Sequence, residues 1–323
     1  MAIIACNAIA VPLAISFPVS ELRHIINLAQ ANVLLASDKF LSRAKEVIAE
    51  GLDSSPSLHN IQEIPARSQE TDMWYPDVLY AAQAGIMLFT SGTTAKPKGV
   101  MLSDATLSAQ AQSLMEAWSY GPSDHLLHVL PLHHIHGIVN AILTPLLSGG
   151  CIEFMYPFEA EKVWRRLAAP FLEDTDVLDK GNMPPYGSSI SPITFFTAVP
   201  TIWSRMLEAY SSLSPRLQAA GREAISRQHL RLNISGSAAL PKPIRDEWTA
   251  LSGGNILLER YGMTEVGMAL SCGLDEQDRI DGSVGWPLPS VQVRLVETDV
   301  NGVQTVIEPV SYTHLTLPTN REV

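Results

Sequence analysis

The stretch that decides the fold class runs from Gly85 to Gly99 and reads GIMLFTSGTTAKPKG. Its first five residues are apolar and predict a buried strand, Gly85–Phe89. Between Thr90 and Gly99 the chain carries four hydroxyl side chains, two glycines and two lysines. Hydroxyl and backbone N–H groups donate to phosphate oxygens, and lysine supplies positive charge. The loop is therefore a candidate polyphosphate site, and we expect a helix to follow it, with Ser103 as the N-cap.

This loop has two alternative interpretations. Glycine, threonine and proline are ordinary loop residues, so a polar connection that binds nothing would have the same composition. A Walker loop requires GxxxxGK[ST], and in this chain Lys96 is followed by Pro97. The lysine pattern therefore disfavours an NTP-hydrolysing P-loop protein.

On both sides of the loop, short apolar segments alternate with segments of helical periodicity. This alternation predicts an α/β fold with mostly parallel sheets flanked by helices. A different pattern begins near Gly282, where two strand-like segments, 291–296 and 303–307, flank an Asn301-Gly302 turn. The expected strands before that point are Ala31–Ala36, His125–Leu130, Cys151–Met155, Ile193–Ala198, Leu230–Ile234 and Ile256–Leu258.

We expect three parts along the chain. Residues 1–281 form an α/β domain that begins partway through its fold, and residues 282–309 begin a β-rich subdomain. Residues 310–323 read VSYTHLTLPTNREV and resemble the translation of a sequencing adapter; a genuine strand is the alternative. A polar, proline-containing segment, 173–192, is expected to be a surface loop.

Composition excludes several classes of protein. The net charge of −11 argues against nucleic acid as a partner, and no apolar run reaches the roughly 18–20 residues of a membrane span. The three cysteines lack metal-ligand spacing and favour a reducing compartment. The content of 46% hydrophobic residues is sufficient for a substantial core.

The loop TSGTTAKPKG resembles the phosphate-loop signature, TSGTTxxPKG, of the acyl-adenylate-forming (AMP-binding) superfamily. The resemblance implies the large N-terminal domain of that fold. Ala95 departs from the family, which usually has glycine there, and alanine restricts the backbone. The resemblance implies nucleotide-binding roles for seven residues of the loop: Thr90, Ser91, Gly92, Thr93, Thr94, Lys96 and Lys98.

Four later motifs follow in the family's order and extend the resemblance to Pro289. They read PLHHIHG (131–137), RLNISGSAAL (231–240), ERYGMTE (259–265) and GSVGWPLP (282–289). The resemblance implies catalytic roles for His134, Thr264 and Glu265, with Glu265 also the magnesium ligand. It further implies adenine and nucleotide contacts by Gly236, Ser237, Ala238, Ala239, Tyr261 and Gly262. We expect the loop at Thr90 and the turn at Thr264 to face one nucleotide pocket.

Within the superfamily, the motifs are most similar to malonyl-CoA synthetases, including acyl-CoA synthetase family member 3. A dicarboxylate such as malonate or methylmalonate needs a cation for its distal carboxylate, because burying an unpaired charge is costly. Arg231 and Arg260 adjoin the two ligand-facing turns and are candidates, with assistance from His136. Either arginine also suits a structural salt bridge, and the sequence leaves both alternatives open.

The resemblance implies an ATP-dependent acid–thiol ligase that forms an acyl-adenylate and then a CoA thioester. ATP, Mg²⁺ and coenzyme A are the implied co-substrates and metal. No match to the family's catalytic C-terminal lysine occurs, so we expect this chain to bind ATP or AMP weakly and to adenylate poorly. The alternatives are another short- or medium-chain acyl-CoA synthetase and a non-catalytic nucleotide-binding fragment. The expected compartment is mitochondrial or cytoplasmic, with any targeting region outside these residues.

Overall fold

The computed structural model describes residues 2–62, 84–90, 96–172, 191–298 and 304–307. Their contacts divide the chain into two compact units. Of the described residues, the first unit contains those up to 108 and 132–134, and the second contains 109–131 and those from 135 to 307. No helix within the described ranges is long and apolar enough to cross a membrane. Most of the expected loop 173–192 and all of the expected tail 310–323 lie outside the described residues.

The described part of the first unit contains two small sheets. One pairs β2 with β3 in parallel, and the other joins β1, β4 and β5. Leu22 and Ile26 of α2 pack with Ala44 and Val47 of α3 in a small apolar cluster, which is typical of helices covering one face of a sheet. The elements are α1 (Ala2–Ala5), β1 (Ile9–Ala10), α2 (Val19–Leu28), β2 (Val33–Ala36), α3 (Asp38–Ala49), β3 (Ser57–Asn60), β4 (Gly85–Thr90) and β5 (Lys98–Ser103).

Between the phosphate-loop motif and the helix expected from Ser103 lies a strand, β5, that the sequence did not predict. β5 runs antiparallel to β4, and Thr90 is paired with Lys98 across the hairpin. The helix α4 (Asp104–Ala117) begins only after β5. Ser103 is its N-cap as predicted, since the backbone N–H of Thr106 donates to Ser103 Oγ over 3.2 Å.

Seven strands in the described part of the second unit form one sheet in the order β12-β11-β10-β9-β8-β6-β7. The five strands from β7 to β10 run parallel, whereas β11 and β12 are antiparallel to their neighbours. The predicted α/β class with mostly parallel sheets is confirmed. The strands are β6 (His125–His128), β7 (Cys151–Phe154), β8 (Phe195–Ala198), β9 (Leu232–Ser235), β10 (Leu258–Met263), β11 (Gly267–Ser271) and β12 (Trp286–Pro287).

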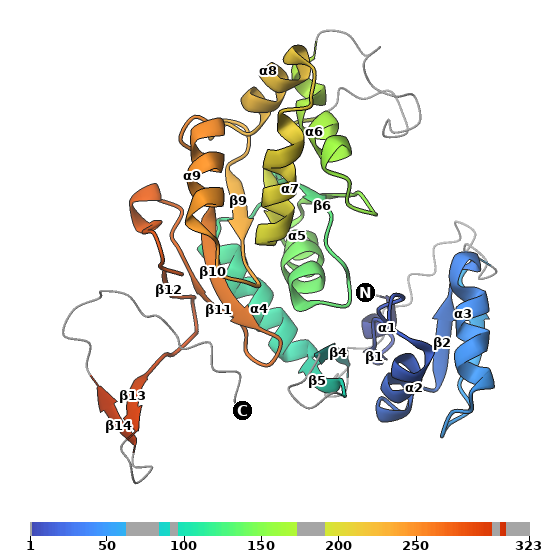
Figure 1. The fold of residues 1–323 in the computed structure, drawn as a ribbon. Helices are drawn as coiled ribbons and strands as arrows, with labels where there is room; N and C mark the ends of the chain where they lie inside the picture. The colour runs from blue at the N-terminus through green and yellow to red at the C-terminus, as the bar shows by residue number, and fades with distance from the viewer. Residues whose placement is uncertain (1, 63–83, 91–95, 173–190, 299–303, 308–323) are drawn as a thin grey trace. The chain divides into compact units, whose positions relative to one another are not determined.

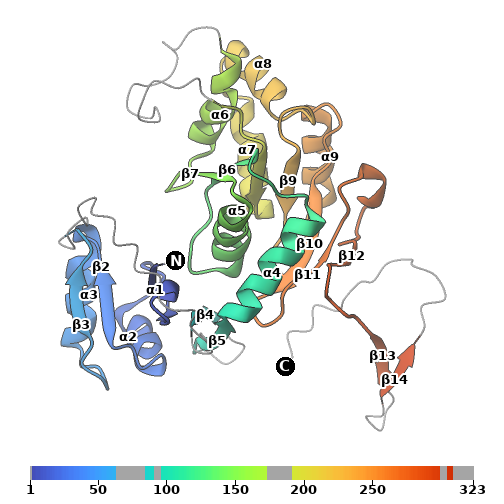
Figure 2. The ribbon, with the colours of Figure 1, turned by 180° about the vertical axis from the view of Figure 1, so that it is seen from behind.

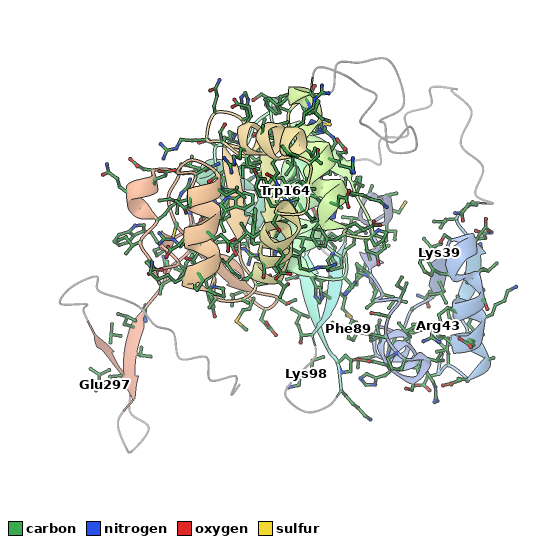
Figure 3. All side chains as sticks on the ribbon, turned by 45° about the horizontal axis from the view of Figure 1, so that its top comes forward. Lys39, Arg43, Phe89, Lys98, Trp164 and Glu297 are labelled. Atoms are coloured by element: carbon green, nitrogen blue, oxygen red, sulfur yellow. The ribbon has the colours of Figure 1, made fainter. Side chains whose placement is uncertain are left out.

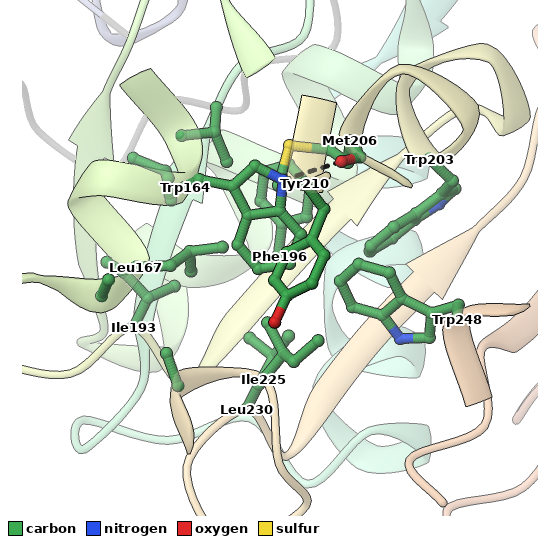
Figure 4. Close-up of a cluster of buried hydrophobic side chains, with 14 of the residues drawn as sticks. Trp164, Leu167, Ile193, Phe196, Trp203, Met206, Tyr210, Ile225, Leu230 and Trp248 are labelled. Atoms are coloured by element: carbon green, nitrogen blue, oxygen red, sulfur yellow. Dashed lines mark hydrogen bonds between the residues drawn. The ribbon is translucent and has the colours of Figure 1, made fainter. Parts of the chain in front are cut away.

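Helices cover both faces of this sheet. Figures 1 and 2 show α7 and α9 on one face and α4 and α5 on the other. On the face covered by α7 and α9, the ring of Trp203 packs edge-on against the rings of Phe196 and Trp248 (Figure 4). The ring centroids are 5.2 Å and 4.6 Å apart, respectively. The helices are the π-helix η1 (His136–Leu143), α5 (Thr144–Ser148), α6 (Ala160–Ala168), η2 (Ala169–Phe171), α7 (Pro200–Tyr210), α8 (Pro215–Ala224), α9 (Lys242–Leu251) and η4 (Glu276–Asp278).

Two details of the second unit bear on the sequence predictions. The strand expected at Ile256–Leu258 begins only at Leu258, where β10 starts, and it extends to Met263. Sequence patterns did not indicate its partner β11. The predicted hairpin near the end of the chain is confirmed, because β13 (Leu295–Thr298) pairs antiparallel with β14 (Gln304–Ile307). The domain boundaries expected at residues 282 and 310 stay predictions.

Candidate functional site

The phosphate-loop motif lies on the β4–β5 hairpin of the first unit. Ser91, Gly92, Thr93, Thr94 and Ala95 fall outside the described residues, so their predicted roles stay predictions. Thr90 ends β4, and the exposed side chains of Lys96 and Lys98 lie where the chain enters β5 (Figure 3 labels Lys98). A Walker loop leads directly into a helix N-terminus. Because a strand follows here, the local fold agrees with the sequence argument against a P-loop protein.

The three histidines of PLHHIHG fall in different units. His133 and His134 belong to the first unit, with ring centroids 4.3 Å apart, whereas His136 belongs to the second. Burial, with a smaller contribution from His134, lowers the pKa of His133 to about 4, so His133 is neutral at pH 7. Within the described ranges, no three His, Cys, Asp or Glu side chains lie together as a metal site. The role of His134 stays a prediction.

The turn after β9 is built for close approach of another group. Gly236 directly follows the strand, and a Cβ there would collide with the guanidinium of Arg260. Ser237 adopts a left-handed backbone conformation with φ of 67°, which is uncommon for residues other than glycine. Ser237, Ala238 and Ala239 are exposed. The predicted ligand-facing turn therefore presents small, accessible side chains beside a buried arginine.

Arg260 is a buried cation on β10, with only 3% of its surface exposed. Its Nη2 donates to Ser237 Oγ over 3.4 Å, while its Nε has no hydrogen-bond partner among the described residues. Burial lowers the pKa of Arg260 to about 9, which still leaves the group charged at pH 7. A buried charge without a counter-ion is costly, so this position favours an anionic ligand.

His136 joins the same group from the first residue of η1. Its Nδ1 lies 3.1 Å from Ser237 Oγ, and its Nε2 lies 2.6 Å from Thr197 Oγ1 at the end of β8. A π-helix in this position agrees with the frequent occurrence of π-helical turns at functional sites. The predicted residues His136, Ser237 and Arg260 are thus brought together. Sequence reasoning missed Thr197, whose only signal was a hydroxyl within the apolar strand FFTA.

Arg231 does not belong to this group, which corrects its assignment as a substrate residue. It precedes β9, so it lies at the amino end of the parallel strands, whereas ligands bind outside the carboxyl ends. Its Nε donates to Asp124 Oδ1 over 2.7 Å, and its Nη2 pairs with Asp124 Oδ2. Its remaining donors reach the carbonyls of Trp118 and Ser119. The structural salt bridge left open by the sequence is the alternative found.

Asp124 explains why this pair is structural. Its carboxylate is 3% exposed and also accepts hydrogen bonds from Gly121 N–H and Thr194 Oγ1, each over 3.0 Å. Burial acts to raise the pKa of Asp124, but the hydrogen bonds from Arg231, Gly121 and Thr194 outweigh it and hold the pKa below its ordinary value. The carboxylate is charged at neutral pH and depends on Arg231 for its counter-ion.

The motif ERYGMTE forms the end of β10 and the turn into β11. The pairing register shifts between Tyr261 and Gly262, as in a β-bulge. Thr264 lies in the turn that follows, and Glu265 is exposed there. Mg²⁺ is usually held by one or two carboxylates together with substrate phosphates, so a single accessible carboxylate suits that mode of binding. The assigned roles of Tyr261, Gly262, Thr264 and Glu265 stay predictions.

A surface hollow in the second unit contains none of the predicted site residues. It measures about 630 Å³ and lies among α7, α8 and α9, where Tyr210, Arg222 and Glu247 contribute to its lining. The polar group at Arg260 is assembled by η1 and by the ends of β8, β9 and β10 instead. We place the candidate site there, because it combines a buried charge with convergent polar groups.

A model of the AMP-binding enzyme family matches residues 1–171 and 189–307. The chain belongs to the AMP-binding enzyme family. This membership confirms the resemblance found on the motifs and agrees with the β-sheet architecture. It also accounts for the order of the motifs along the chain.

Two curated proteins and one solved structure are among the proteins similar to this chain. A CoA ligase of Gibberella moniliformis is 61% identical over 315 residues, covering 95% of this chain and 52% of that protein. The mitochondrial malonate–CoA ligase ACSF3 of Homo sapiens is 37% identical, covering 90% of this chain and 47% of that protein. ATP-bound MatB from Rhodopseudomonas palustris superimposes with a TM-score of 0.71 at 26% identity, covering 93% and 53%. This AMP-binding chain spans about half the length of the curated relatives it matches.

Proposed function

We propose that this chain is the substrate-binding half of an AMP-forming acyl-CoA synthetase that activates a small dicarboxylate, malonate or methylmalonate. The observation that carries the proposal is the buried guanidinium of Arg260, which has no counter-ion among the described residues. A monocarboxylate presents its one charge to the reacting centre. A dicarboxylate has a second charge that needs a partner.

The arrangement around Arg260 suits a carboxylate oxygen. Arg260 contributes an unpaired Nε donor, and Ser237 contributes a hydroxyl on an exposed turn. Arginine presents its donors in a planar fork that matches carboxylate geometry. The absence of a side chain at Gly236 lets the guanidinium of Arg260 lie directly against the backbone of this turn, since a Cβ there would collide with it. These features support a site for the distal carboxylate of the substrate, with His136 as a neighbour.

In the reaction we propose, the other carboxylate attacks the α-phosphorus of ATP and pyrophosphate leaves. The thiolate of coenzyme A then attacks the acyl carbon and releases AMP. This chain's part is to bind and orient, because fixing both reactants removes much of the entropic barrier. Thr90, Ser91, Gly92, Thr93, Thr94, Lys96 and Lys98 would donate to phosphate oxygens, and Tyr261 would lie against adenine.

Mg²⁺ is the metal that this proposal implies. When bound, it neutralises charge on the phosphate oxygens, and Glu265 would hold it. Thr264 would donate to the α-phosphate, and His134 would lie between the acyl and nucleotide sites. A mitochondrial location is proposed from the human relative, whose name includes that compartment, with the cytoplasm as the alternative.

The proposal is tested on a chimera that joins this chain to the part of the Gibberella moniliformis CoA ligase that it does not cover. Pyrophosphate release would be measured with malonate, methylmalonate, acetate and butyrate. We expect pyrophosphate release with the dicarboxylates to be about 100-fold faster than with the monocarboxylates, which corresponds to the free energy of one buried charged pair. Equal rates on all four acids would refute the dicarboxylate and favour a short- or medium-chain synthetase. No adenylation of any acid would favour a non-catalytic nucleotide-binding protein.

A further inference from the structure

Thr197 is the next-to-last residue of β8 and lies close to the carboxyl edge of the sheet, where we place the candidate site. Its side chain is 1% exposed, and its Oγ1 lies 2.6 Å from Nε2 of His136. Among the described residues, the Thr197 hydroxyl has no other hydrogen-bond partner. The other ring nitrogen of His136, Nδ1, lies 3.1 Å from Ser237 Oγ, and Ser237 Oγ accepts from Arg260 Nη2. Four side chains therefore form one hydrogen-bonded chain.

The direction of these hydrogen bonds follows from which groups can donate. Arginine only donates, so Ser237 Oγ must accept from Arg260. A neutral histidine carries its proton on one ring nitrogen and accepts on the other. If Nε2 carried the proton, the hydroxyl hydrogen of Thr197 would be buried without an acceptor, which is costly. If Nδ1 carries it, Thr197 donates to Nε2 and Nδ1–H donates to Ser237 Oγ, so the hydrogens of both contacts have acceptors.

We infer that Thr197 is a positioning residue that holds His136 in the Nδ1–H tautomer and thereby makes the Ser237 hydroxyl a donor toward the ligand. In this arrangement Nδ1–H of His136 and Nη2–H of Arg260 occupy the two lone pairs of Ser237 Oγ. The serine can then only donate. The exposed Ser237 hydroxyl is then a donor offered to an anion, next to the buried positive charge of Arg260.

This arrangement has a consequence for specificity. A site that offers only hydrogen-bond donors discriminates against ligand groups that are themselves donors. Such a group would place its donor against a donor of the site, and neither would have an acceptor. A carboxylate is an acceptor at both oxygens. That the anion is the distal carboxylate of a small dicarboxylate rests on the proposed function. The assignment of the tautomer does not.

The test separates these two claims. Long-range ¹H–¹⁵N NMR of the ligand-free chain reports the tautomer of His136, assigned by the signal lost in His136→Gln. We expect the proton on Nδ1 in the natural chain and in Thr197→Ser, which keeps the hydroxyl. In Thr197→Val, which has the same shape without the hydroxyl, we expect the Nε2–H form to become populated.

Malonate titration of the same three chains supplies the second readout. Thr197→Val should raise the Kd by about tenfold, the loss of one ligand hydrogen bond, and Thr197→Ser should restore it. A proton on Nε2 in the natural chain overturns the inference, as does a Thr197→Val chain with unchanged tautomer and Kd. A lowered Tm with an unchanged tautomer would assign Thr197 a purely structural role, which also overturns it. Failure of the natural chain to bind malonate refutes the proposed substrate, and the tautomer comparison still decides the role of Thr197.

Discussion

Arg231 and Arg260 should respond to mutation in opposite ways, although each adjoins a turn with a ligand-binding motif. We predict that Arg231→Ala lowers the free energy of unfolding and leaves malonate binding unchanged. We predict that Arg260→Met lowers malonate affinity and leaves stability unchanged or higher. The reason is that Arg231 is the counter-ion of a buried carboxylate, whereas Arg260 has no counter-ion in the described part of the chain.

The magnitude for Arg231 follows from its contacts. Removing its side chain leaves Asp124 with only the Gly121 N–H and Thr194 hydroxyl donors. Breaking a buried ion pair by removing one partner costs about 3–5 kcal/mol. The Arg231 side chain is 33% exposed, and solvent weakens the pair on that side, so we expect about 3 kcal/mol. For Arg260→Met the expected loss of malonate affinity is about 100-fold.

Urea unfolding followed by tryptophan fluorescence would measure stability, and calorimetric titration would measure malonate affinity. Arg231→Lys is the matched control, since it keeps the charge but loses the two-point contact with Asp124, and we expect an intermediate stability. An Arg231→Ala chain that unfolds like the natural chain but has lost malonate binding would refute the reasoning. That result would assign Arg231 a role in substrate binding.

Two further predictions concern the neighbours of Arg260. Gly236→Ala should weaken malonate binding by about tenfold in a calorimetric titration, because the added Cβ displaces the guanidinium of Arg260. An unchanged Kd would contradict the close approach. Glu259 is 9% exposed, and burial raises the pKa of its carboxyl from 4.5 to about 7. Between these pH values the folded chain binds more protons than the unfolded chain, so stability falls as the pH rises through that window. Glu259→Gln should therefore remove that pH dependence and raise the free energy of unfolding by about 3 kcal/mol at pH 8. Equal pH profiles from urea unfolding of both chains would contradict this prediction.

Local sequence patterns determined the fold class and several local elements of this protein. Propensities and contacts between near neighbours in the chain set the apolar strand Gly85–Phe89, the Ser103 cap and the pairing of β13 with β14. The periodicity of alternating strands and helices was sufficient to predict the α/β class. The motif order was sufficient to identify the family.

Only the tertiary structure decided which polar residues work together. Arg231 and Arg260 have similar sequence contexts, but the direction of β9 places Arg231 at the amino edge of the sheet, and the register of β10 places Arg260 beside Gly236. Thr197 reaches His136 because β8 and η1 pack together across 61 residues of sequence. β5 and β11 were missed for the same reason, since a strand is stabilised by a partner that its own sequence does not contain. Strand direction, register and long-range packing are properties of the folded chain, and they decide which charge is paired and which remains for a ligand.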